Sequence, residues 1–438
     1  MKRAGLRLAP VVAWLALASS ARAGTPQVTK GPYLTGLSGT TVDVRFELDA
    51  SAPAGVDVTE VGADAGATRT ATDGPASMHV VHVAGLEPGR AYEYAVRAGG
   101  GVIGKGHFAT APKDDAPDAV TFLAYGDDRN DDATHAAIVR AMQATPSDFL
   151  VNTGDMLADG GNPADWQSFF RVEQPLLRDR PLFLAIGNHE LSQDESGSNF
   201  LRYFGYPDGA GTVQPFGTIR WGSARLFFLN GMHDWKSGPE RRWLETELGR
   251  ADAEPGLVWR IAVVHHGPWS SGPHGGNNLL IDARVPELLA AHHVDLVLAG
   301  HDHLYDRGDA GTLKYVVTGG GGAPLYPVKH RSSTSRHAES AYHFVEITLT
   351  RDSLKLVAHR LDGTALDTCG FAKGGGWDCD ARPKADAPAL AGQAPGSDAS
   401  PASSRCSCTL PGVSGGGVGE GLLALGIVGM VACRRRRG

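Results

Sequence analysis

Five short apolar segments of the chain each end in residue types that bind metal ions. Each apolar run is rich in β-forming residues and followed by Gly, Asn or Asp, which predicts a buried strand that runs into a loop. In an open α/β sheet, ligands and active-site loops gather at the carboxyl ends of the strands, so the five ends are expected at one edge of one sheet. The segments are FLAYGDDR (Asp127), FLVNTGD (Asp155), LFLAIGNHE (Asn188), IAVVHHGP (His265) and LVLAGHDH (His301 and His303).

Two aspartates, one asparagine and three histidines in one place predict metal chemistry. Their mixture of oxygen and nitrogen donors suits Zn, Mn or Fe better than Mg or Ca alone. The set is large enough for two ions if one carboxylate bridges them. Two ions about 3.5–4 Å apart can clamp a phosphate and deliver a hydroxide to it in line. The residues therefore predict a two-metal hydrolase.

The motifs GDxx, GD, GNHE, HHxP and GHDH, in this order, resemble the signature of the calcineurin-like metallophosphoesterases over residues 118 to 362. The resemblance implies two divalent ions bridged by Asp155. His265 and His266 point opposite ways on a strand; the family pattern places His265 at the ions and His266 in a supporting or core position. By the same matching, the first ion binds Asp127 and His303, and the second binds Asn188, His265 and His301.

The chain departs from this family pattern at the first ion. Purple acid phosphatases carry GDxxY, and the tyrosine position is Ala158 here; other members carry GDxH, and the histidine position is Arg129. The first ion is therefore one ligand short, and either His135 or water is expected to complete it. Without the tyrosine, a divalent pair of Zn, Mn or Fe(II) is expected rather than the ferric purple centre.

Three further residues are candidates for catalysis. The resemblance implies that His189 contacts the phosphoryl group and assists the leaving group; the alternative is a hydrogen bond that supports a ligand. His274, in WSSGPHGG, either protonates the leaving oxygen or lies in a mobile surface loop. Arg129 either contacts two phosphate oxygens with its planar fork or forms a surface salt bridge. Glu190 is expected to support a ligand rather than to catalyse.

These motifs favour an acid phosphatase-like enzyme in which metal-bound hydroxide attacks phosphorus. Phosphomonoesters are the expected substrates, because the N-terminal segment and the WSSGPHGG loop resemble those of phosphatases. A phosphodiesterase that uses the same site is the alternative within enzymes. The other alternative is a non-catalytic, metal-stabilised binding protein of the cell surface.

The elements around these motifs predict an α/β fold. Strands alternate with amphipathic patterns that predict helices over residues 134–144, 240–248 and 285–291, which indicates a metallophosphoesterase β-sandwich flanked by helices. A Gly-rich run at residues 319–324 lacks the Lys-Ser/Thr of a P-loop, so it predicts close backbone packing behind the metals.

Residues 24–113 are expected to form a separate all-β domain. Their alternating runs TTVDVRFEL and MHVVHV predict strands. The segment GLEPGRAYEYAVRA with FATAP, and GPYLTGL near the start, resemble the fibronectin type III-like sandwich that precedes the catalytic domain of purple acid phosphatases. This domain could act as a spacer, stabilise the catalytic domain or bind a surface partner.

The two ends of the chain predict export. Residues 1–23 have the basic start, apolar core and small-x-small cleavage site of a signal peptide. Residues 363–405 are expected to be a tail and disordered linker, in which an oxidising compartment would allow Cys369 and Cys379 to pair. Residues 406–438 resemble a myxobacterial C-terminal sorting signal, so transient membrane association and then the cell surface, outer membrane or secretion are expected; a plain short anchor is the alternative.

The formal net charge of −7 bears on partners. Phosphate backbones demand a basic surface, so nucleic acid is not an expected partner. A small phosphate ester remains compatible, because bound metals supply a local positive field.

Overall fold

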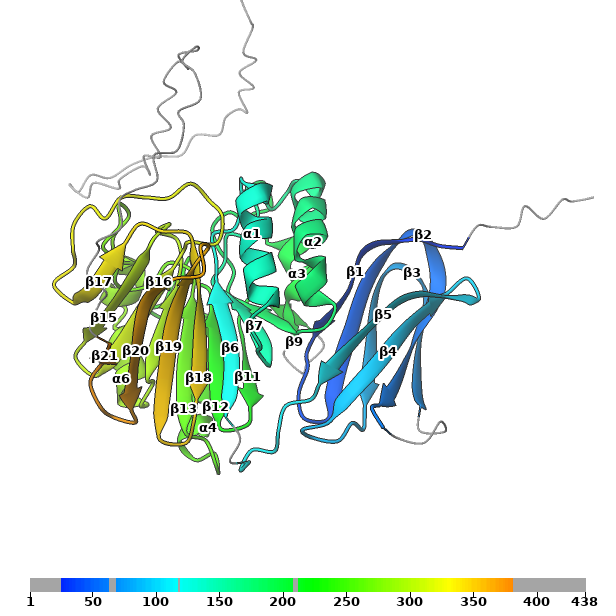
Figure 1. Ribbon diagram of the computed structural model, residues 1–438, viewed down its shortest axis with the longest axis horizontal. Coiled ribbons are helices and arrows are strands. Elements are labelled where there is room, and N and C mark those ends of the chain that lie inside the picture. The colour runs from blue at the N-terminus through cyan, green and yellow to red at the C-terminus, as the bar shows by residue number, and fades with distance from the viewer. Residues whose placement is uncertain (1–24, 63–67, 117–118, 208–211, 381–438) are drawn as a thin grey trace, which may run out of the picture. The chain divides into compact units, whose positions relative to one another are not determined.

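The computed structural model describes residues 25–62, 68–116, 119–207 and 212–380 (Figure 1). The predicted signal peptide and sorting segment lie outside the described residues. Among the helices that are described, none has the length and apolar character needed to cross a membrane.

The N-terminal part is all-β, as expected. Its five strands form one continuous sheet, because the long β2 pairs with β1 through its first half, with β4 through its second half and with β3 along both. The fibronectin type III-like assignment stays a prediction. The strands are β1 (Val28–Thr35), β2 (Thr41–Glu60), β3 (Thr68–Ala84), β4 (Ala91–Ala98) and β5 (Gly101–Ala109).

The described residues from 119 to 380 form the part that is expected to be catalytic, and its first large sheet has the order β21-β20-β19-β18-β6-β7-β8. Strands β6, β7 and β8 are parallel, and β18 joins β6 antiparallel. Its strands are β6 (Val120–Tyr125), β7 (Phe149–Asn152), β8 (Leu182–Leu184), β18 (His343–Leu349), β19 (Ser353–Arg360), β20 (Ala365–Ala372) and β21 (Asp378–Cys379).

The second large sheet has the order β11-β12-β13-β14-β16-β15-β17, and β12, β13, β14 and β16 are parallel. A short ribbon of β9 (Tyr206–Pro207) and β10 (Val213–Gln214) precedes it along the chain. The strands of the second large sheet are β11 (Gly217–Trp221), β12 (Ala224–Leu229), β13 (Trp259–Val264), β14 (Leu296–Ala299), β15 (Tyr305–Ala310), β16 (Leu313–Thr318) and β17 (Ser335–Glu339).

The two large sheets pack face to face, and helices pack against part of the outer face of each (Figure 1). Buried side chains of both sheets, such as Phe122, Phe149, Phe228 and Ile261, form one core between them. This confirms the predicted sandwich flanked by helices. The helices are α1 (Asp132–Gln143), α2 (Pro163–Leu177) and α3 (Ser198–Phe204) on the first sheet, and α4 (Pro239–Asp252), α5 (Asn278–Asp282) and α6 (Val285–Ala291) on the second.

Two expectations about this region need correction. The five motif strands do not belong to one sheet: β6, β7 and β8 lie in the first and β13 and β14 in the second. The catalytic domain also extends past residue 362, because β20 and β21 complete the first sheet where a tail was expected. Both strands were missed because sheet membership depends on long-range pairing rather than on local pattern.

Tyr33 of the N-terminal sheet joins that sheet to the helices of the catalytic part. Its ring packs against Phe170 of α2 and Phe204 of α3, with ring centroids 4.9 and 5.4 Å away. Its hydroxyl donates to the Tyr203 carbonyl oxygen at 2.9 Å, and Arg45 Nη1 donates to the same oxygen at 3.2 Å. The N-terminal sheet thus shares a core with α2 and α3, as a stabilising domain would.

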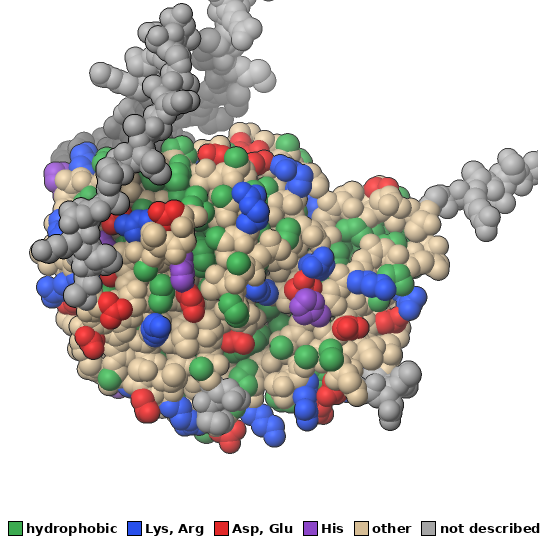
Figure 2. Space-filling model, viewed as in Figure 1, with side chains coloured by type: hydrophobic (Ala, Val, Ile, Leu, Met, Phe, Trp, Pro, Cys, Tyr) green, Lys and Arg blue, Asp and Glu red, His purple; other side chains and the backbone are tan. Residues whose placement is uncertain are grey.

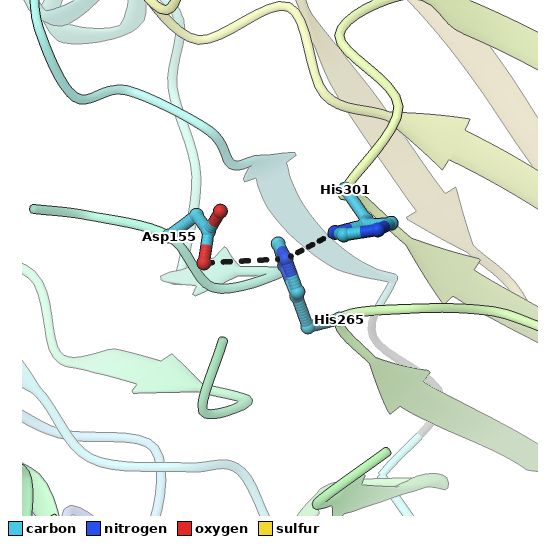
Figure 3. A group of neighbouring side chains, drawn as sticks. All are labelled: Asp155, His265 and His301. Atoms are coloured by element: carbon cyan, nitrogen blue, oxygen red, sulfur yellow. Dashed lines mark hydrogen bonds and ion pairs between the residues drawn. The ribbon is translucent and has the colours of Figure 1, made fainter. Parts of the chain in front are cut away.

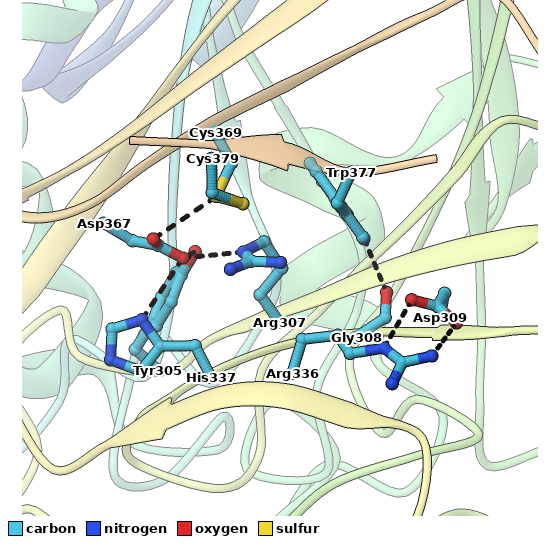
Figure 4. The surroundings of a disulfide bond; sticks show 10 residues. All are labelled: Tyr305, Arg307, Gly308, Asp309, Arg336, His337, Asp367, Cys369, Trp377 and Cys379. Atoms are coloured by element: carbon cyan, nitrogen blue, oxygen red, sulfur yellow. Dashed lines mark hydrogen bonds and ion pairs between the residues drawn. A yellow bond between two sulfur atoms is a disulfide. The ribbon is translucent and has the colours of Figure 1, made fainter. Parts of the chain in front are cut away.

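A disulfide between Cys369 and Cys379 joins β20 to β21. Figure 4 shows Asp367 beside it, which accepts hydrogen bonds from Tyr305 Oη at 2.8 Å and Arg307 Nε at 2.6 Å. The disulfide thus fixes the last strand of the first sheet next to the buried ion pair of Arg307 and Asp367.

Replacing Cys369 and Cys379 together with serine should destabilise the protein by about 2–3 kcal/mol, because a closed loop of this length restricts the unfolded chain. Urea unfolding of the double variant measures the loss. The exposed Ser353 of β19, changed to alanine, is the control. A double variant as stable as the wild type would contradict the prediction.

Candidate metal centre

The predicted ligands follow the carboxyl ends of parallel strands from both large sheets. Asp127, Asp155 and Asn188 follow β6, β7 and β8 in the first sheet, and His265 follows β13 in the second. His301 and His303 follow β14. The centre therefore lies where the carboxyl edges of the two sheets meet.

Atoms of three other predicted ligands lie around His265 Nε2, and Figure 3 shows two of these ligands, Asp155 and His301. Asp155 Oδ1 lies 3.3 Å from it, and Asn188 Oδ1 and His301 Nδ1 each lie 3.2 Å from it. His265 Nδ1 lies 2.9 Å from the carbonyl oxygen of Thr153, which can only accept, so Nδ1 carries the hydrogen. Nε2 of a neutral His265 therefore presents a lone pair to the Asp155 and Asn188 oxygens, which are acceptors, and a cation would resolve this arrangement.

Buried charges shift the pKa values in this group. Burial lowers the pKa of His265, but the neighbouring Asp155 carboxylate raises it more, to about 9. Burial likewise raises the pKa of Asp155, but His265, His189 and Arg129 outweigh this effect and hold it well below its usual range. A proton on His265 balances the group, and a bound divalent ion would fill the same need. These residues fit a metal ion.

Asp127 and His303 form a second pair beside this group. Asp127 is fully buried, and its Oδ2 accepts from the His301 backbone N–H at 2.9 Å. Its Oδ1 has no hydrogen-bond partner among the described residues and lies 3.5 Å from His303 Nε2. His303 Nδ1 lies 2.7 Å from the Pro324 carbonyl oxygen, so Nε2 again presents a lone pair. Burial raises the pKa of Asp127 to about 8 and lowers that of His303 to about 4.

The backbone is strained at three of the ligands. Asp127, Asp155 and His301 have φ angles of 56°, 60° and 71°, in the left-handed region that residues other than glycine rarely adopt. Such strain persists only where surrounding structure enforces it, and it clusters at functional sites. The Gly-rich run supports this packing as predicted: a Cβ on Gly319 would lie 2.8 Å from Asp127 Oδ2.

Glu190 fixes two ligand loops, as expected of a supporting residue. It is fully buried, and its Oε2 accepts from the N–H groups of Gly187 at 2.7 Å and Asp155 at 3.0 Å. Its Oε1 accepts from the N–H of Met156 at 2.8 Å. One carboxylate thus holds the loop after β7 against the loop after β8.

His189 directs one ring nitrogen toward the centre. Its Nδ1 bonds with the Ala158 carbonyl oxygen at 2.7 Å, which leaves Nε2 toward the centre, 3.8 Å from Asp155 Oδ2. Its side chain is 29% exposed, so solvent or a ligand can approach it.

His274 lies next to His301. Their ring centroids are 4.6 Å apart, and the His274 N–H donates to Asp302 Oδ1 at 3.1 Å. The loop that carries His274 is therefore tied to the centre rather than free. His266 packs on the His301 ring at 4.2 Å and bonds with Gly275, in the supporting position expected of it.

His135 does not join the ligands, which corrects the expectation that it completes the first ion. It lies in α1 with its side chain against α2, where Nε2 is 2.6 Å from Glu173 Oε1 and 3.2 Å from Asp128 Oδ2. Tyr125 Oη donates to the same Glu173 oxygen at 2.6 Å. The buried carboxylates raise the pKa of His135 in spite of burial. His135 therefore joins a buried polar network behind the centre.

Two residues of the centre escaped the sequence reasoning. Tyr326 stacks on His303, with ring centroids 4.0 Å apart, and follows the Gly-rich run. Asp302 accepts from Ser270 Oγ at 2.5 Å as well as from His274, and so anchors the His274 loop. Asp302 stands between the two predicted ligands of GHDH, and this position in the sequence could have marked it as part of the centre. Tyr326 had no such signal in the sequence.

A cavity of about 750 Å³ lies away from these residues. Arg45 and Leu37 of the N-terminal part and Phe216 and Trp243 of the catalytic part line it. It contains none of the predicted site residues, so its size alone does not make it the site of chemistry.

Comparison with known proteins defines the class. Residues 122–305 match the family model of the calcineurin-like phosphoesterases. Purple acid phosphatase 4 of Arabidopsis thaliana is 27% identical over 247 residues, which cover 50% of this chain and 72% of that protein. Probable purple acid phosphatase 20 of the same plant is 29% identical over 185 residues, which cover 36% of this chain and 40% of that protein.

Two solved structures share the fold. A purple acid phosphatase from yellow lupin (Lupinus luteus) seeds has a TM-score of 0.67 at 18% identity, covering 79% of this chain and 74% of that one. PhoD has a TM-score of 0.61 at 13% identity, covering 81% of this chain and 92% of that one. The chain carries a calcineurin-like phosphoesterase domain. Its similarity to purple acid phosphatases supports its assignment as a metal-dependent phosphoesterase.

Proposed function

We propose that the protein is an exported, surface-anchored phosphomonoesterase that requires divalent metal. The observation that carries this proposal is the convergence of Asp155, Asn188 and His301 on His265 Nε2. A metal held there would polarise a phosphoryl group and lower the pKa of the attacking water. The relatives named purple acid phosphatases support the monoester as substrate.

The side chains of the protein supply the remaining parts of the reaction. Arg129 is always charged and lies beside Asp155, so it can neutralise charge that develops on phosphoryl oxygens. His189 presents Nε2 toward the centre and can give a proton to the departing oxygen. His274 lies against the His301 ring and so belongs to the same centre.

Hydrolysis assays on the full chain test the proposal. The protein is stripped of metal and then given Mn, Zn, Fe(II) or Ca, with p-nitrophenyl phosphate and bis-p-nitrophenyl phosphate as substrates. Turnover of the monoester restored by metal supports a phosphomonoesterase, and preference for the diester supports the alternative phosphodiesterase. Bound metal without turnover of either ester would favour the alternative, a metal-stabilised surface-binding protein.

Replacing His189 with asparagine should lower kcat by about 10²–10⁴, the usual contribution of a general acid. The loss should be larger for alkyl phosphates than for p-nitrophenyl phosphate, because a poor leaving group needs the proton more. Bound metal should be unchanged. The matched control is His82→Asn, a histidine whose side chain is 61% exposed on the N-terminal sheet. An equal loss for both substrates would contradict a proton-donating role.

Export and surface anchoring rest on the leader and the C-terminal segment, and the Cys369–Cys379 disulfide supports an oxidising compartment. Cell fractionation followed by N-terminal sequencing tests this part. A mature chain that starts near Gly24 is expected, and an intact Met1 in the cytoplasm would contradict it.

A small ester is a better-supported partner than nucleic acid. On the face shown in Figure 2, the basic side chains of the described residues are interspersed with acidic ones. The proposal therefore includes no nucleic-acid partner. The proposal assigns the binding of any surface partner to the N-terminal sheet.

A further inference from the structure

Arg129 lies between two atoms that the first metal ion would bind. Its Nε is 3.4 Å from Asp155 Oδ2, and its Nη2 is 3.3 Å from His303 Nε2. The Arg129 side chain is only 10% exposed, so the guanidinium is part of the centre rather than a surface group.

The contact with His303 is a directed hydrogen bond. His303 Nδ1 is held by the Pro324 carbonyl oxygen, so its Nε2 is an acceptor, and Arg129 Nη2 is a donor that faces it. Arg129 cannot lose its proton in a protein. The positively charged Arg129 guanidinium therefore already donates to Asp155 Oδ2 and to His303 Nε2.

The other side of Asp155 has no such cation among the described residues. Around His265 Nε2, the neighbouring oxygens of Asp155 and Asn188 are acceptors, and His301 Nδ1 lies 3.2 Å away. Among the described residues, Asp155, His265 and His301 form a group of three whose ligand atoms lie within 4.8 Å of one another. No such group of described residues contains Asp127 or His303.

We propose that the protein holds one divalent ion, at Asp155, Asn188, His265 and His301, and that the Arg129 guanidinium takes the place of a second. This inference rests on the proposed function and replaces the two ions expected from the sequence with one. A second ion does not fit beside Asp127 and His303 while the guanidinium bonds both Asp155 and His303. Ala158 offers no ligand to draw an ion there.

One atom favours the opposite result and defines what the test must exclude. Asp127 Oδ1 is buried without a hydrogen-bond partner among the described residues, and a second ion would satisfy it. Arg129 would then have to withdraw from Asp155 and His303. The number of ions per chain decides between the two arrangements.

The test measures metal stoichiometry on the full chain. The stripped protein is saturated with Mn(II), freed of excess metal and analysed by elemental analysis and electron paramagnetic resonance. One ion per chain with an isolated Mn(II) spectrum is expected for the wild type. Arg129→His, which replaces the cation with a neutral ligand, should bind two ions and give the spectrum of a coupled pair. Arg171→His is the matched control, because that arginine is 63% exposed on α2, and it should bind one ion.

Each of the other outcomes overturns either the one-ion inference or the proposed function. Two coupled ions in the wild type would overturn the inference and leave the proposed phosphomonoesterase intact. One ion in both the wild type and a folded Arg129→His would show that Arg129 does not exclude the second ion. No bound ion and no metal-dependent turnover would overturn the proposed function itself. Circular dichroism confirms that each variant is folded.

Discussion

Replacing Asp155 with asparagine should abolish both metal retention and phosphoester hydrolysis. Asp155 Oδ1 lies 3.3 Å from His265 Nε2, and Oδ2 lies 3.4 Å from Arg129 Nε, so both oxygens serve the centre. An asparagine of the same size removes the charge and turns one oxygen into a donor. Losing a residue that only supports a ligand lowers metal affinity about 10–100-fold, so losing this ligand should lower it by more than about 100-fold.

Metal titration and phosphatase assays at fixed metal concentration measure the two losses for Asp155→Asn. Asp115→Asn is the matched control, since Asp115 is exposed in the segment between the N-terminal sheet and β6. The control should keep both metal and activity. Wild-type metal content in a folded Asp155→Asn protein would show that the ion binds elsewhere and would remove the basis of the proposed chemistry.

The placement of the candidate ligands after strand ends was predictable because each has a local signal. An apolar run followed by Gly and a polar residue marks the end of a buried strand, and that is where Asp127, Asp155 and Asn188 lie. The sequence could not show that β13 and β14 belong to a different sheet from β6. Strand pairing joins segments far apart in the chain, so it has no local pattern.

The wrong expectation for His135 has a related cause. Its position eight residues after Asp127 made it a candidate ligand, but its partner Glu173 lies 38 residues away on α2. That helix was not predicted, although Asn162 caps its first turn and Pro163 starts it. Without α2, no buried carboxylate was available to explain His135.

The part played by Arg129 shows a different limit. The sequence revealed that a ligand was missing from the first ion, and it offered a phosphate contact or a surface salt bridge for the arginine that stands there. Neither alternative anticipated bonds to both Asp155 and His303, because those residues come from different sheets. The side-chain arrangement exists only after the two sheets pack.

Replacing Glu190 with alanine should weaken metal binding and destabilise the fold together. The carboxylate accepts three backbone N–H groups, from Gly187, Asp155 and Met156, and all of these bonds are buried. Each buried donor left without a partner costs about 1–3 kcal/mol, so the three together should lower the free energy of unfolding by about 3 kcal/mol or more. Metal affinity should fall about 10–100-fold, because the Asp155 and Asn188 loops lose their common support.

Urea unfolding of the metal-free protein and metal titration separate the two effects in Glu190→Ala. Glu195→Ala is the matched control, because Glu195 is an exposed glutamate in the same loop. Glu190→Gln should fall between the alanine variant and the wild type, since its amide keeps one acceptor oxygen but sets an NH₂ group against a backbone N–H. Unchanged metal affinity in a destabilised Glu190→Ala protein would mean that the ligand loops hold their positions without the carboxylate. The strained backbone at Asp155 would then have to be enforced by its other contacts, with His189, His265 and Arg129.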